Sequence, residues 1–206
     1  MGKDIIKKYI VFVIGTLVFG FSISLSNRSL LGCNSMATLV VGINKNCSLD
    51  YGTCNLLVGI VEIIVGLIFD RKNVTFATIF GLFCCSYFID LADLIVVESS
   101  SLFIRIIYFV AGMILYCLGV AIQQYSKCGY ANLDCFIFGL KRAFRVKDYH
   151  TIKWFVDIGF IVIGYLLGSV VGIGTIIMFM FTGLLIERFL NMLNKSNILR
   201  WLLWNY

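Results

Sequence analysis

The sequence predicts an all-α membrane protein of two homologous halves, with six transmembrane helices and two short or re-entrant segments. The first reason is composition, because 60% of the 206 residues are hydrophobic and only 14% are charged, against about 25% charged in a soluble domain. The second is an uncharged run between Asp157 and Glu187, which exceeds the about 20 residues of one bilayer crossing. The third is a weak internal repetition at an offset of 97 residues.

The first half is predicted to cover residues 1–98. Its long apolar runs predict three transmembrane helices, over Tyr9–Ser26, Thr53–Phe69 and Thr75–Val97. A shorter segment, Leu30–Ile43, lies between the first two and is interrupted by glycines and polar residues. The polar stretch Glu98–Ser101 then forms a hinge, where we place the boundary between the halves.

The second half, residues 102–206, repeats this order within one membrane domain, residues 1–206. Long helices are predicted over Phe103–Gln124, Ile152–Leu167 and Thr175–Leu193, and the short segment is Cys128–Leu140. At the offset of 97, four glycine or threonine pairs and one acidic pair coincide, which indicates a duplication: Gly15 with Gly112, Gly32 with Gly129, Gly42 with Gly139, Thr78 with Thr175, and Asp90 with Glu187. The final aromatic residues, Trp201, Trp204 and Tyr206, are expected at the membrane interface.

The number of crossings depends on the two short segments. If both span the bilayer, the protein has eight helices and parallel halves; if both are re-entrant, it has six crossings and inverted halves. Short-loop Lys and Arg residues favour the cytoplasm, and six crossings put Arg71, Lys72 and Lys127 with the other cytoplasmic cations. We therefore expect inverted repeats in a multi-pass plasma-membrane protein with both termini in the cytoplasm.

The short segments are the first candidates for a binding site. Short, Gly-interrupted apolar segments at matching positions of two repeats indicate the binding site of a transporter. Their polar residues are Asn34, Ser35 and Thr38 in the first half, and Asn132 and Asp134 in the second. Asp134 could hold a cation, bind an amine or relay a proton, because a carboxylate inside an apolar segment tends to face a cavity. The alternatives are that these small residues only allow close helix packing, and that Asp134 is a capping acid.

A second candidate is the start of the last helix. The residues Gly174 and Thr175 follow a glycine-rich turn, and the free backbone amides of a helix N-terminus favour anions. The alternative, which we prefer, is a turn followed by a threonine cap, because the Lys of a phosphate-binding loop is absent.

Other classes of protein are not expected. The only histidine, His150, lies in the basic loop Lys141–Lys153 away from any nucleophile, so we predict no enzyme and no cofactor. The eight cysteines form no CxxC pair, so no metal site is expected. The net charge of +6 is explained by cytoplasmic loops rather than by nucleic acid.

Three stretches carry a resemblance to a known family: FGFSISLSNRSLLGCNS, YGTCNLLVGI, and GSVVGIGTII with LLIERFL. They resemble the YitT/YczE-type family of bacterial multi-pass membrane proteins over nearly the whole chain. In that family the segment after the first helix carries a Gly followed by Pro-Trp-Asp. Gly129 and Asp134 match this frame, while the Pro and Trp are absent. The resemblance implies an integral plasma-membrane protein.

The leading functional prediction is a small-solute transporter with its site between the two repeats near the bilayer midplane. One alternative is a substrate-capture subunit of an ATP-driven importer, whose first helix usually carries an alanine stripe; here it offers only Gly15 and Gly20. Another is a non-transporting accessory protein. The expected partners are the lipid bilayer and a small-molecule solute, with a homo-oligomer left open.

Overall fold

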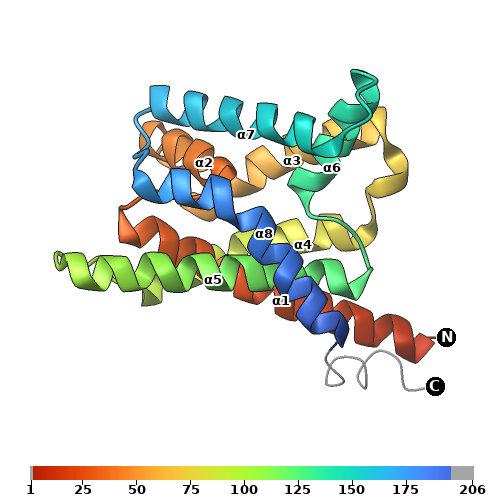
Figure 1. Cartoon of the computed structure of the whole chain (residues 1–206), viewed down its shortest axis with the longest axis horizontal. Coiled ribbons are helices and arrows are strands. Elements are labelled where there is room, and N and C mark those ends of the chain that lie inside the picture. Colours follow the sequence, from red (N-terminus) through yellow and green to blue (C-terminus); the bar gives the residue numbers. More distant parts are fainter. Residues whose placement is uncertain (1, 196–206) are drawn as a thin grey trace.

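A computed structural model describes residues 2–195, and within them the chain is all-helical (Figure 1). The helices are α1 (Gly2–Ser29), α2 (Ser35–Asn46), α3 (Tyr51–Phe69), α4 (Phe76–Ile95), α5 (Leu102–Ser126), α6 (Asn132–Ala143), α7 (Tyr149–Leu166) and α8 (Ile173–Lys195), with a 3-10 turn at Arg71–Asn73. The all-α prediction and its order of long and short segments are confirmed. The aromatic residues Trp201, Trp204 and Tyr206 lie outside the described residues.

Five of the described helices, α1, α3, α4, α5 and α8, are long and apolar enough to cross a membrane. Large hydrophobic side chains stay exposed on them, such as Leu94 at 82% and Ile173 at 78%. Soluble monomers rarely expose so much contiguous apolar surface, so these helices are consistent with a multi-pass membrane protein. The sixth expected span, α7, is not among the five, and it carries Lys153 and Asp157.

Helix α1 packs against both α4 and α5. It runs parallel to α4, because the Tyr9 and Phe76 rings lie 6.5 Å apart near the starts of the two helices. Near their ends, Arg28 Nη1 lies 2.9 Å from Glu98 Oε1. It runs antiparallel to α5 (Figure 1), since Arg105 Nε donates to the Ser29 carbonyl at 2.7 Å.

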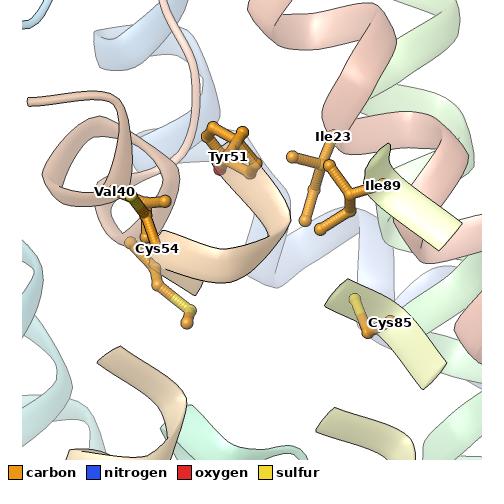
Figure 2. Close-up of a cluster of buried hydrophobic side chains, with 7 residues drawn as sticks. Ile23, Val40, Tyr51, Cys54, Cys85 and Ile89 are labelled. Carbon is orange, nitrogen blue, oxygen red and sulfur yellow. The ribbon is translucent and has the colours of Figure 1, made fainter. Parts of the chain in front are cut away.

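Helix α3 runs antiparallel to α4 and closes the first core cluster. Its N-terminus is held by the Asp90 carboxylate near the end of α4, which accepts from the Gly52 amide at 2.6 Å. Figure 2 shows the buried cluster between α1, α2, α3 and α4, where Ile23 and Ile89 lie near each other. The short helix α2 joins this cluster through Val40, which is fully buried.

Each short helix lies along a long helix of the other half of the chain. Helix α2 packs against α7, and α6 packs against α3. Glycines make both contacts close: a Cβ added at Gly42 would lie 2.7 Å from the Gly164 carbonyl oxygen, and one at Gly139 would lie 3.0 Å from the Val65 carbonyl oxygen. Small residues are typical of such close helix packing in membranes.

Candidate functional site

The site begins where the chain turns after α1 and after α5. Leu30 and Lys127, 97 positions apart, both have a left-handed backbone, with φ of 54° and 53°. This conformation is uncommon for residues other than glycine and ends a helix sharply. Five residues separate each of these helices from the short helix that follows, so both short helices begin after an extended connection.

Each connection is held by the last long helix of the opposite half. Before α2, the Leu31 carbonyl accepts from the Gly174 amide at 2.9 Å. Before α6, the Tyr130 carbonyl accepts from the Thr78 hydroxyl at 2.9 Å. Gly32 and Gly129 allow the approach, because an added Cβ would collide with Thr175 or with Thr75, respectively. Each connection is therefore fixed by the start of a long helix of the other half, through a backbone amide in one case and a side-chain hydroxyl in the other.

The first residue of each short helix then binds a carboxylate on the long helix beside it. The Ser35 hydroxyl donates to Asp157 Oδ1 on α7 at 2.5 Å. The Asn132 amide donates to Glu62 Oε2 on α3. Both carboxylates lie near a helix N-terminus, whose partial positive charge stabilises an anion by about 0.3–1 kcal/mol.

The two carboxylates differ in their other partners. Asp157 also accepts from Lys153 Nζ at 3.0 Å, one turn earlier on α7, so this pair is neutral. Glu62 is only 1% exposed, and its Oε1 has no hydrogen-bond partner among the described residues. An unpartnered polar atom of this kind costs about 1–3 kcal/mol when buried, and more if it is charged.

A cavity of about 430 Å³ opens between the N-termini of α2 and α6. This volume is within the usual range of about 300–1,000 Å³ for small-molecule sites. Amide and charged side chains line it from both halves: Asn34, Asn55, Gln124, Asn132, Asp134, Lys153 and Glu187. Three tyrosines, Tyr51, Tyr116 and Tyr149, add apolar faces with polar ends.

A second cavity, of about 660 Å³, adjoins the first and shares Gln124, Asp134 and Tyr149 with it. The Tyr149 hydroxyl donates to Asp134 Oδ1 at 2.5 Å, so one hydrogen bond lies on the boundary of both cavities. The second cavity is also lined by the exposed residues Lys127 and Tyr130. It therefore lies between the central cavity and the outer surface at the end of α5.

Three of the predicted site residues, Asn34, Asn132 and Asp134, line the central cavity. Ser35 does not line it but holds Asp157 at its edge. Thr38 is buried one turn further along α2, where its hydroxyl donates to the Asn34 carbonyl at 2.9 Å.

Gly174 and Thr175 are not among the residues that line either cavity. They pack against the connection before α2, as described above, and Thr175 Oγ1 is buried without a hydrogen-bond partner in the described chain. Their contact with that connection fits the turn interpretation of this glycine-rich segment.

Asp148, the cap of α7, accepts from the Thr151 amide and hydroxyl, and these bonds lower its pKa.

Sequence reasoning did not assign Glu62 or Asp157 to the site, although both were visible as single charges in apolar runs. That signal usually marks a bundle-facing or cavity-facing group. Within residues 2–195 no group of three or more His, Cys, Asp and Glu side chains is arranged to hold a metal ion. The central cavity is therefore characterised by its amide, charged and tyrosine lining alone.

The fold and site define a helical protein with several membrane-compatible spans and a polar cavity between two short helices. Residues 6–191 match the model of DUF6198, a family of unknown function, and the chain belongs to this family. It is similar to the "Uncharacterized protein YyaS" of Bacillus subtilis (strain 168), with 27% identity over 194 residues, covering 91% of this chain and 94% of that protein.

An "Uncharacterized protein" of Haemophilus influenzae is 23% identical over 189 residues, which cover 92% of this chain and 86% of that protein. No solved structure matches the chain. Neither the family nor these two relatives bear the YitT or YczE name, so that particular resemblance stays a prediction.

Proposed function

We propose that this protein is a small-solute membrane transporter whose binding site is the central cavity between two inverted repeats. The observation that carries the proposal is that the first turns of α2 and α6 line one polar cavity together. In membrane transporters, broken or short helices that end near the midplane supply free backbone groups and side chains to the solute.

The directions of the long helices support six crossings and inverted halves. Helix α4 runs parallel to α1. Two helices start on the same side of the membrane and run parallel when the chain crosses it an even number of times between their starts. If only α1 and α3 cross before α4 begins, that number is two. A crossing by α2 would make three and reverse α4. Helix α5 is antiparallel to α1, which matches three crossings in the first half. In this proposal α7 is the sixth span, although Lys153 and Asp157 make it less apolar.

The reciprocal packing supports the internal repeat. Gly32 lies against Thr175, and its counterpart Gly129 lies against Thr78, the counterpart of Thr175. Each short helix packs on the long helix of the other half, so the two halves exchange equivalent contacts. In this proposal the site lies on the pseudo-two-fold axis between the repeats.

Alternating access then follows from rocking one half against the other around the cavity. The second cavity is the entry path on the side where α5 ends, and the hydrogen bond between Asp134 and Tyr149 lies between it and the solute site. The positive-inside rule assigns this side to the cytoplasm, because the basic loop at residues 141–147 follows α6 there.

The small residues of α1 give little support to the substrate-capture alternative. Gly15 faces α5, where an added Cβ would lie 2.9 Å from the Gln123 amide nitrogen, and Gly20 faces α4, 3.3 Å from Phe88 Cβ. Both glycines are used inside the chain, so they are not free to dock a partner. The accessory-protein alternative predicts that no solute binds.

A thermal-shift screen of the detergent-purified protein tests the proposal. The panel contains amino acids, vitamins, amines and metal ions, and a compound that binds the native state raises the melting temperature by mass action. We expect a hit that Asp134→Asn abolishes and that Asp148→Asn retains. The second variant is a matched control, because Asp148 is exposed at the cap of α7 and Asn caps a helix as well as Asp. A flat screen with both variants unaltered in stability would favour the accessory protein.

A further inference from the structure

Glu62 occupies the middle of α3, a helix long and apolar enough to cross the membrane. Its side chain is almost fully buried, and only one of its two oxygens has a hydrogen-bond donor, the Asn132 amide. An ionised carboxylate needs several donors or a cation when it leaves water. Glu62 has one donor, and the about 0.3–1 kcal/mol that the N-terminus of α6 can give an anion is small against the several kcal/mol that burying an ion costs. Its surroundings therefore fit the neutral acid better than the ion.

The acidic and thiol groups that face Glu62 do not compensate a negative charge. From α6, Asp134 lies in the same first turn as Asn132, and its carboxyl group brings no positive charge. Cys135 also faces α3, but its thiol donates to the Asn73 carbonyl at 3.3 Å. From α4, the Cys85 thiol packs in the same core cluster as Cys54 of α3, and Asp90 accepts from the Gly52 amide at the other end of α3.

The basic side chains on the elements packed against α3 lie at its ends. Lys45 on α2 donates to the Gly168 carbonyl at 2.9 Å, and Arg142 on α6 pairs with Asp70 beyond the end of α3 at 3.0 Å. The remaining ones are Arg71, Lys72 and Lys141. Of the ion pairs between described residues, none involves Glu62.

A proton is the cation that suits this position. A metal ion would need several oxygen ligands in one place, and the described residues bring no such group together. The proton comes from bulk water and forms an O–H bond at Oε1, while Oε2 continues to accept from Asn132. No other bond changes.

We propose that Glu62 is a proton-binding site that couples solute movement through the central cavity to proton movement. Asn132 is the link, because its side chain donates to Glu62 and also lines the cavity. Release of the proton leaves a carboxylate that holds the Asn132 amide more tightly, which changes the donors available to the solute. By linkage, the solute and the proton then alter each other's binding by the same factor. The coupling rests on the proposed transport function, but the proton site does not.

Infrared spectroscopy of the full chain in lipid at neutral pH tests the proton site without any solute. We expect a carbonyl band of a protonated carboxylic acid that disappears in Glu62→Gln and stays in Asp157→Asn and Asp134→Asn. Asp157 is the matched control, because it binds the first residue of the other short helix and has Lys153 as its ion-pair partner. A spectrum without this band, or a band that Glu62→Gln leaves unchanged, would overturn the proton site.

A second variant covers the case in which Glu62→Gln fails to fold. In Asn132→Ala the acid remains but loses the donor to Oε2, so its carbonyl band is expected to shift to higher frequency. An unshifted band would mean that the protonated group is elsewhere, and would overturn the assignment to Glu62.

Coupling is tested in proteoliposomes that contain a trapped pH-sensitive dye. Compounds from the panel that raise the melting temperature are added outside, and we expect them to change the internal pH with native protein but not with Glu62→Gln. A proton band with a flat panel would keep the proton site and reject the transporter. Solute uptake without a pH change, or with one that Glu62→Gln retains, would keep the transporter and reject the coupling.

Discussion

The regions around the starts of α2 and α6 are built alike, but the carboxylates that they bind differ in their charged partners. At the start of α2, Ser35 binds Asp157, and Lys153 on the same helix supplies the opposite charge. At the start of α6, Asn132 binds Glu62, and no described cation completes the pair. In both places the first residue of a short helix binds a carboxylate of a neighbouring helix, but one carboxylate has a lysine partner and the other has no described cation.

This difference suggests a structural role for Asp157 and a role for Glu62 that depends on its protonation state. The pair of Asp157 and Lys153 can hold α2 against α7 at any protonation state of the rest of the site. Glu62 has no described cation beside it, so in our proposal it is neutral at rest and the α3 and α6 side is where a change of charge can act. The predictions below test this contrast, from the largest expected effect to the smallest.

Lys153→Ala should be the most destabilising single change, because it leaves Asp157 as a buried charge without its cation. Removing one partner of a buried pair costs about 3–5 kcal/mol. Lys153 is 32% exposed, so we expect about 2 kcal/mol, measured as a lower melting temperature in detergent. Lys147→Ala in the exposed loop is the control, and adding Asp157→Asn to Lys153→Ala should restore most of the loss. Equal stability of the two lysine variants would contradict the pairing.

Replacing a contact glycine by alanine should cost more stability between α2 and α7 than between α3 and α6. A Cβ at Gly164 would lie 2.5 Å from the Thr38 carbonyl oxygen, whereas one at Gly66 would lie 3.1 Å from the Cys135 carbonyl oxygen. Overpacking costs about 1–3 kcal/mol, so Gly164→Ala should lower the melting temperature more than Gly66→Ala. Gly159→Ala has open space around it and should be nearly neutral. The reverse order would refute the close contact.

Asn132→Ala should cost only about 1 kcal/mol, the usual net value of one hydrogen bond, provided that Glu62 is already neutral. Ser35→Ala is the counterpart on the other side and should cost a similar amount, since Asp157 keeps Lys153. A loss of several kcal/mol in Asn132→Ala alone, in the melting assay, would indicate an ionised Glu62 that depends on this donor.

The smallest contrast concerns the two corresponding threonines. Thr78 forms a capping box with Thr75 and donates to the Tyr130 carbonyl, so Thr78→Val should cost about 1 kcal/mol. The hydroxyl of Thr175 is buried without a described partner, so Thr175→Val should be neutral or slightly stabilising. Equal losses of chemical-denaturation stability would show that the two hydroxyls have equivalent partners.

The elements of the fold were predictable because apolar runs and their interruptions depend on local sequence. The two short segments were recognised, although Leu30–Ile43 begins in the connection and α2 itself covers Ser35–Asn46. The position of Asn34, Asn132 and Asp134 beside one cavity agrees with what polar residues in short apolar segments predicted, while a binding role for them stays a prediction. These signals lie within single segments.

The partners of Glu62 and Asp157 were not predictable in this way. Each carboxylate meets a residue of the other half, 70 positions away for Glu62 and 122 for Asp157, and only the tertiary fold brings them together. The same holds for Gly174 and Thr175, whose glycine and threonine pattern resembles an anion site but packs against the connection before α2.

The most direct test of the inverted arrangement is cysteine accessibility in intact cells. With the exposed Cys47 replaced by Ser, single variants Lys72→Cys, Ser100→Cys and Lys147→Cys are treated with a membrane-impermeant maleimide. Inverted halves with six crossings predict labelling of position 100, while positions 72 and 147 react only after permeabilisation. If positions 100 and 147 instead lie on one side and position 72 on the other, α2 and α6 span the membrane and the halves are parallel, which would contradict the account.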